Sequence, residues 1–183
     1  MGEWSKDSKT NVATMADNDF RHNEKSVILD NEDTLSIVLK TADGEQTLLP
    51  ELPVLKGEVI DGTFMSAKAL DEFLLAQVKR AKEEGVLFST HLKATMMKVS
   101  DPILFGHVVR AFFADVYDKY GEELLAAGLN GENGLGAIYE GLKNLDNGEE
   151  IKAAFDAALS DGPDLAMVNS HKGITNLHVP SDV

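Results

Sequence analysis

The chain has 183 residues, enough for one domain or large lobe that buries about 70% of the surface of its unfolded chain. Its hydrophobic content of 43% and charged content of 26% are typical of a globular protein and argue against general disorder. A formal net charge of −14 argues against nucleic-acid or anionic-membrane partners. The absence of cysteine excludes disulfides, zinc–thiolate sites and a cysteine nucleophile.

The chain also lacks the sequence signals of secretion and of membrane insertion. The N-terminal sequence MGEWSKDSKTNV has no apolar core like that of a signal peptide. No apolar run approaches the roughly 20 residues that span a bilayer. We therefore expect a cytoplasmic location, with residues 1–183 forming a single domain or lobe.

Short alternating segments dominate the N-terminal third, after about 30 polar and irregular residues. Residues 34–40 (TLSIVLK) alternate and are β-branched, which predicts a strand. Residues 42–45 contain an Asp-Gly pair that favours a hairpin turn, and residues 46–49 are the expected partner strand. A third strand is predicted over residues 57–65, with an internal Asp-Gly break.

The pattern changes to helical spacing after this region. Apolar residues at intervals of three and four predict a helix over residues 67–84, capped by Ser66 and ended by Gly85. The apolar run from Val86 to Leu92 then predicts a short buried strand.

A second strong helix is predicted over residues 102–120. Asp101 is the expected N-cap, Pro102 occupies the favoured first helical position, and Gly121 is expected to end the helix. Its apolar stripe continues along the whole length. A shorter helical face follows over residues 135–145.

The C-terminal part is predicted to contain one more helix and two strands. The helix begins at Asn147 and stops at Gly162-Pro163. Residues 165–168 and 174–179 are the expected strands, joined by a turn at residues 170–173. The fold class that follows is α/β, a mixed sheet with flanking helices. The N-terminal third is β-rich and the remainder helix-rich, with α+β as the alternative.

The segment between the predicted buried strand at residues 86–92 and the second predicted helix concentrates polar side chains. It carries His91, Lys93, Thr95, Lys98, Ser100 and Asp101. Proteins of the α/β class place ligands where strands end and helices begin. Burial can lower the pKa of a lysine there, which suits proton transfer. The competing interpretation is a solvated loop lysine beside two core methionines.

Three other features are weaker candidates for chemistry. The glycine-rich residues 130–136 lack the spacing of phosphate-binding loops, so a helix–helix loop with Asn133 as a cap is predicted. His107 lies among apolar residues, where a hydrogen-bonded core histidine is expected. Three residues could ligate a metal by their type, although their spacing matches no standard site: His171, His178 and Asp182.

Several long segments of the sequence resemble one enzyme family. HLKATMMKVSDPILFGHVV, residues 91–109, resembles the active-site lysine region of monomeric-type NADP-dependent isocitrate dehydrogenases. The words GLNGENGLGAIYEGL, LAMVNSHKGITNLHVPSDV and MGEWSKDSKTNVA resemble other stretches of the same family. The resemblance runs along essentially the whole chain in order. It implies an internal segment of an enzyme several times longer.

By this resemblance, Lys93 takes the place of the catalytic lysine, which lies near the 2-hydroxyl group of the substrate and carries protons. Lys98 is the competing assignment. The resemblance implies isocitrate as substrate and NADP with Mg²⁺ or Mn²⁺ as cofactors of the full-length enzyme. The family's metal aspartates and NADP-binding residues would lie outside this chain, and Asp182 would be a neighbour of the first metal aspartate. We therefore expect no cofactor bound to this chain alone.

Three hypotheses remain at this point. The first is a segment of an NADP-dependent isocitrate dehydrogenase that is inactive in isolation and that binds the remainder of its parent chain. The second is a non-catalytic structural or interaction module derived from the same fold. The third is a small metal-dependent enzyme that uses the two C-terminal histidines and Asp182.

Overall fold

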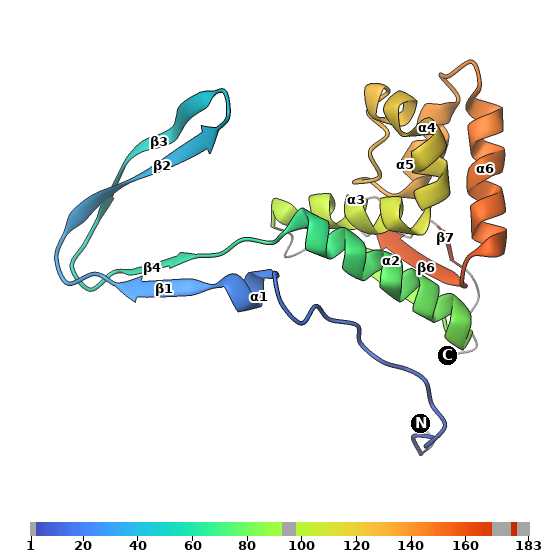
Figure 1. Ribbon diagram of the computed structural model, residues 1–183, viewed down its shortest axis with the longest axis horizontal. Helices are drawn as coiled ribbons and strands as arrows, with labels where there is room; N and C mark the ends of the chain where they lie inside the picture. Colours follow the sequence, from blue (N-terminus) through green and yellow to red (C-terminus); the bar gives the residue numbers. More distant parts are fainter. Residues whose placement is uncertain (1–2, 93–97, 170–176, 179–183) are drawn as a thin grey trace. The chain divides into compact units, whose positions relative to one another are not determined.

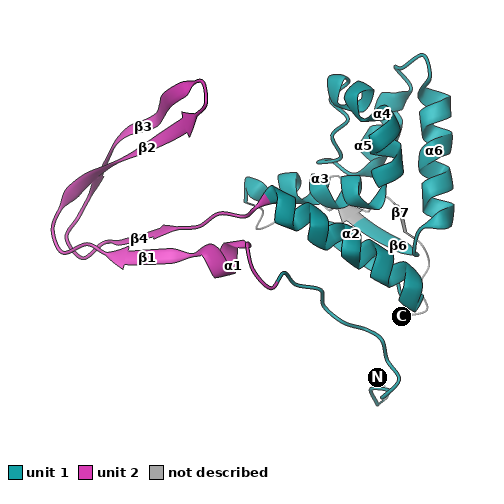
Figure 2. Ribbon diagram, in the orientation of Figure 1, with its two compact units in different colours: residues 1–15, 67–183 teal, residues 16–66 magenta. Residues whose placement is uncertain are grey.

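The computed structural model describes residues 3–92, 98–169 and 177–178. Helices and short sheets are both present, which confirms the mixed α/β class. The chain divides into two compact units, one of residues 1–15 with 67–183 and one of residues 16–66 (Figure 2). The organisation as a single domain or lobe remains a prediction.

The unit of residues 16–66 contains the predicted hairpin (Figure 1). Strands β2 (Asp33–Thr41) and β3 (Gly44–Val54) pair antiparallel around a tight turn. Gly44 has a φ of +134°, a conformation that glycine adopts readily. Strand β3 extends well beyond the predicted residues 46–49. It does so through two prolines, which an edge strand tolerates because its outer N–H groups need no partner.

A second antiparallel ribbon pairs β1 (Lys25–Ile28) with β4 (Val59–Gly62). Two expectations are corrected here. The N-terminal polar region contains β1 and a one-turn helix, α1 (Phe20–Asn23), although it was expected to be irregular. The third strand is shorter than residues 57–65 and pairs with β1, because the chain connections bring these two segments together beyond the hairpin.

Helix α2 (Ala67–Glu84) follows the predicted bounds. Gly85 has a φ of +62°. The N–H groups of Gly85 and Val86 donate to the carbonyls of Lys82 and Ala81, at 3.3 and 3.0 Å. This pair of bonds is the Schellman motif that ends helices at glycine. The predicted face is buried through Leu70, Leu74 and Ala81.

The single helix predicted over residues 102–120 is wrong, because the structure has two helices there. Helix α3 (Ser100–Phe112) and helix α4 (Ala114–Ala126) are separated at Phe113, whose φ of −106° and ψ of 36° leave helical geometry. Phe113 is fully buried. Both helices cover the same core, so the apolar stripe continues across the break.

The expected ends of this region also shift. Helix α3 begins at Ser100, so Asp101 is not its N-cap. The Asp101 carboxylate instead accepts a 3.0 Å hydrogen bond from the N–H of Lys98. Gly121 lies inside α4. The helix ends in a Schellman motif at Gly128, which has a φ of +74°.

Two more helices complete the bundle, and both were predicted. Helix α5 (Leu135–Leu142) begins after Gly134, one residue later than the expected cap Asn133. Helix α6 (Gly148–Asp161) begins after Asn147 as expected. The Asn147 side chain donates a 2.9 Å hydrogen bond to Glu123 of α4 instead of capping α6.

A three-stranded mixed sheet lies beside these helices. Strand β5 (Phe88–Leu92) runs parallel to β6 (Leu165–Asn169), and β7 (Leu177–His178) runs antiparallel to β6. The strands expected at residues 86–92 and 165–168 are therefore confirmed. Residues 170–176 and 179–183, with the expected turn and the ends of the last strand, lie outside the described residues.

One hydrophobic core joins the sheet to helices α3 to α6. Phe155 of α6 is fully buried. Its ring centroid lies 5.0, 6.1 and 6.2 Å from the ring centroids of Phe113, Tyr117 and Tyr139. Edge-on arrangements at these distances are favourable for aromatic pairs. The core therefore fixes β5 against α3, which follows it, and β6 against α6, which precedes it.

Candidate functional site

Strands β5 and β6 end at the same edge of the sheet. Their parallel register places Leu92 opposite Asn169, so both strands finish side by side. The sequence KATMM, residues 93–97, follows β5, and the sequence SHKGI, residues 170–174, follows β6. Ligands of α/β proteins bind beyond the carboxyl ends of parallel strands. This sheet edge is therefore the candidate functional site.

The two candidate lysines differ in what the structure describes. Lys93 follows directly after the last residue of β5, and its own position lies outside the described residues. Lys98 lies just before α3 and is exposed. Its backbone N–H donates a hydrogen bond to the Asp101 carboxylate. The choice between the two lysines therefore remains a prediction.

The last residues of β5 present alternating faces. Phe88 and Thr90 are half-buried and Leu92 is buried, whereas Ser89 and His91 are exposed. The strand was predicted to be buried, but one of its faces is open. Ser89 Oγ lies 2.7 Å from His91 Nε2. Sequence reasoning missed this pair, although a spacing of two residues in a predicted strand could have indicated it.

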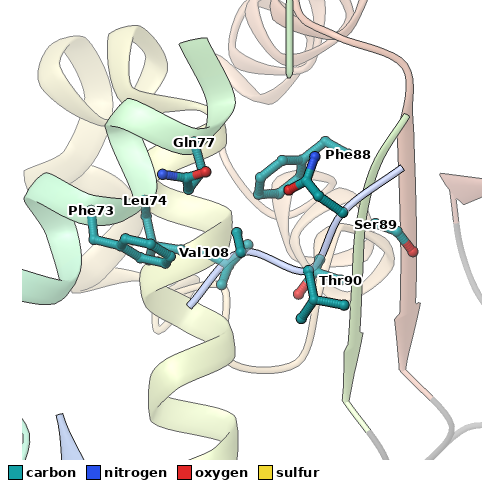
Figure 3. Close-up of a pocket in the computed structure, with 10 residues that line it drawn as sticks. Phe73, Leu74, Gln77, Phe88, Ser89, Thr90 and Val108 are labelled. Carbon is teal, nitrogen blue, oxygen red and sulfur yellow. The ribbon is translucent and has the colours of Figure 1, made fainter. Parts of the chain in front are cut away.

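A pocket of about 380 Å³ lies between β5, α2, α3 and the N-terminal segment (Figure 3). Figure 3 shows Phe73, Leu74 and Gln77 of α2 and Val108 of α3 around it, opposite Phe88 of β5. Its lining side chains are all uncharged: Asn11, Val12, Ala13, Phe73, Leu74, Gln77, Phe88, Ser89, Thr90 and Val108. A neutral lining does not suit a tricarboxylate or a pyrophosphate, which need cationic or N–H donors.

His107 is hydrogen-bonded, as expected, but it is partly buried in α3 and not part of the core. Its Nδ1 atom lies 2.5 Å from Oδ1 of Asp71, and the histidine side chain is only 15% exposed. The pair connects α3 to α2. A polar side chain at this depth needs such a partner, because an unsatisfied group would oppose folding.

The glycine-rich loop before α5 is structural, also as predicted. The Arg110 guanidinium donates a 2.8 Å hydrogen bond to the carbonyl of Asn130, and the Tyr117 hydroxyl donates one of 3.1 Å to the carbonyl of Leu129. Burial raises the pKa of Tyr117 to about 12, although nearby Arg110 lowers it. The Arg110 guanidinium therefore holds the backbone of this loop in place.

Comparison with known proteins places the sequence of this chain in a family. The family described as monomeric isocitrate dehydrogenase matches residues 1–183. The chain is 77% identical to isocitrate dehydrogenase [NADP] of Corynebacterium efficiens and 74% identical to that of Corynebacterium glutamicum. It is 47% identical to the Azotobacter vinelandii enzyme. The chain belongs to the monomeric isocitrate dehydrogenase family.

All of this chain aligns in each of these comparisons, and it spans 25% of the length of each relative. Residues 91–109, which resemble the family's lysine region, thus lie within the matched segment. No helix in the described part of the chain is both long and apolar enough to cross a membrane.

The described residues of this isocitrate dehydrogenase segment were compared with the ligand set that a metal ion needs. They include no cluster of three or more histidine, aspartate or glutamate side chains that could hold a metal ion. His171 and Asp182 lie outside the described residues, and His178 is placed only as a backbone residue of β7, opposite Ala166. A metal site at these residues stays a prediction of the third hypothesis.

Proposed function

We propose that this chain forms one quarter of an NADP-dependent isocitrate dehydrogenase, which oxidises and decarboxylates isocitrate to 2-oxoglutarate. The observation that carries the proposal is the family match over residues 1–183, with relatives named isocitrate dehydrogenase [NADP] that are about four times as long. The isolated chain is inactive in this proposal.

Lys93 is the residue to which we assign proton transfer at the 2-hydroxyl group of isocitrate. It follows β5 at the edge where two parallel strands end, which is where α/β proteins bind ligands. A positioned ammonium group near an anionic substrate can donate and accept a proton, and such a group typically contributes ~10²–10⁴-fold to rate. Lys98 is the alternative for this role.

The remaining groups of the reaction come from outside the chain in this proposal. NADP accepts the hydride and Mg²⁺ or Mn²⁺ polarises the substrate oxygens, both held by the rest of the parent polypeptide. A cytoplasmic location belongs to the same proposal, because the substrate and cofactor are water-soluble. Cell fractionation with an antibody to this chain tests it, and recovery in a membrane or secreted fraction would contradict it.

Exchange of the matching segment in a known enzyme tests the proposal. The 183 residues replace the corresponding quarter of the Corynebacterium glutamicum enzyme, to which they are 74% identical. The chimera should form NADPH from isocitrate at a rate within about tenfold of the parent. An inactive chimera with a native circular dichroism spectrum would instead favour the non-catalytic module.

The isolated chain supplies the complementary experiment. Fluorescence titration with NADPH should show no saturation up to millimolar chain, because the binding groups for the cofactor are assigned to the rest of the enzyme. Saturable binding with a micromolar constant would contradict this expectation. A parallel titration with Mn²⁺ tests the metal-dependent hypothesis for the C-terminal histidines.

A further inference from the structure

The unit of residues 16–66 exposes an unusual amount of apolar surface. Val54 is its one buried residue, and ten of the sixteen exposed large hydrophobic side chains among the described residues lie within it. A two-stranded ribbon alone is at best marginally stable in water, because it has too little apolar burial to offset its chain entropy. The ribbons therefore need a covering surface to be stable.

Five leucine and isoleucine side chains line one face of the β2–β3 hairpin. Leu35 lies opposite Leu52, and Ile37 lies opposite Leu49. Residues two apart on a strand share a face, so Leu39 continues the same row. These five residues form what we call the ribbon face. Ile37, Leu39 and Leu52 remain 52%, 44% and 41% exposed.

The opposite face of the hairpin is mainly polar. It carries Thr34, Ser36 and Lys40, with Val38 (39% exposed) as its apolar member on β2. The Lys40 ammonium forms a 2.7 Å ion pair with Glu45 on β3. One apolar and one polar face are typical of an antiparallel pair that packs against a core on one side and meets water on the other. The hairpin thus has the pattern of a sheet layer that packs on one side only.

We propose that the ribbon face docks on an apolar surface formed by the rest of the parent isocitrate dehydrogenase polypeptide. The relatives that cover this whole chain are about four times its length, so most of the enzyme that could supply this surface lies outside the 183 residues. This inference rests on the family membership and not on the role proposed for Lys93.

Two observations favour this occupant over the alternatives. A second copy of the chain carries the same formal charge of −14, and like charges oppose self-association. Among the described residues outside 16–66, the exposed large hydrophobic side chains are few. They are spread over the N-terminal segment, α2, the start of α3 and α4: Trp4, Val12, Leu75, Val99, Ile103 and Leu125.

Hydrogen–deuterium exchange on two proteins tests the docking. The isolated chain and the chimera with the Corynebacterium glutamicum enzyme are compared over residues 35–39 and 48–52. We expect exchange at least about 100-fold slower in the chimera, because docking links hairpin opening to loss of the covered surface. Equal rates in the two proteins would overturn the proposal.

The other occupants give different results in the isolated chain. Protection that grows with concentration would identify a second copy, and protection that is independent of concentration would mean that the chain covers its own ribbon. Either result would overturn the proposal. An active chimera with an unprotected ribbon would refute the docking alone, whereas an inactive chimera with a protected ribbon would refute only the proposed function.

Matched variants locate the contact on the ribbon face. Ile37→Glu in the chimera should speed exchange of the hairpin at least tenfold, and it should leave exchange in the isolated chain unchanged. Ser36→Glu, on the polar face one residue away, should have neither effect. If the Ile37→Glu chimera fails to fold, Ile37→Ala gives the same comparison with a smaller change. Equal effects of the Ile37 and Ser36 variants would contradict docking through this face.

Discussion

Two glycine-to-alanine substitutions in the helical unit should change stability in opposite directions. Gly121 lies inside α4, where an added Cβ would meet only Tyr117 atoms at 3.9 Å. Alanine there should stabilise by about 0.5–1 kcal/mol, because glycine loses more backbone freedom in a helix. At Gly148, the first residue of α6, a Cβ would lie 1.9 Å from the carbonyl oxygen of Leu142. The backbone must move, so Gly148→Ala should destabilise by about 1–3 kcal/mol or more.

Urea denaturation followed by circular dichroism at 222 nm measures both changes. At roughly 2–4 °C per kcal/mol for a chain of this length, thermal melting should show Gly121→Ala a few degrees above and Gly148→Ala several degrees below the parent. If Gly121→Ala lowered stability, the continuity of α4 through residue 121 would be wrong. If Gly148→Ala were neutral, the close packing of α6 against the end of α5 would be wrong.

The remaining predictions concern the core and its pH dependence. Phe155→Ala should cost about 3–5 kcal/mol, because it removes a fully buried ring, whereas Leu125→Ala at a 55% exposed position should cost far less. A Phe155 variant as stable as the Leu125 variant would contradict the core assignment. The raised pKa of Tyr117 means that its stabilising effect is complete below pH 10 and is lost as pH rises towards about 12. Tyr117→Phe should therefore flatten the fall of stability above pH 10 in urea titrations, and an unchanged slope would contradict burial of the hydroxyl.

Local sequence signals predicted the elements whose ends are set locally. The turn at Gly44 and the helix end at Gly85 both depend on a glycine with positive φ, and the sequence pattern placed both. The break at Phe113 could not be predicted in this way, because neither glycine nor proline marks it. Its ring packs 4.9 Å from that of Phe112 and 5.0 Å from that of Phe155, so tertiary contacts fix the break.

Long-range pairing explains the other differences. The polar segment at β1 has little strand signal of its own, and it pairs with β4 because the hairpin between them brings both together. Apolar alternation predicted the ribbon hairpin but not that its apolar face would stay open. At the candidate site, the sequence located a strand end followed by a lysine, and the structure added that β6 ends beside it.

The most direct test of the account is the turnover of two lysine variants in the chimera. Lys93→Met should lower the rate of NADPH formation by ~10²–10⁴-fold. Methionine keeps much of the length and apolar stem of lysine, so the circular dichroism spectrum should be unchanged. Lys98→Met, which removes a nearby exposed charge, should keep turnover near that of the parent chimera. A folded and active Lys93→Met protein beside an inactive Lys98→Met protein would contradict the assignment of proton transfer to Lys93.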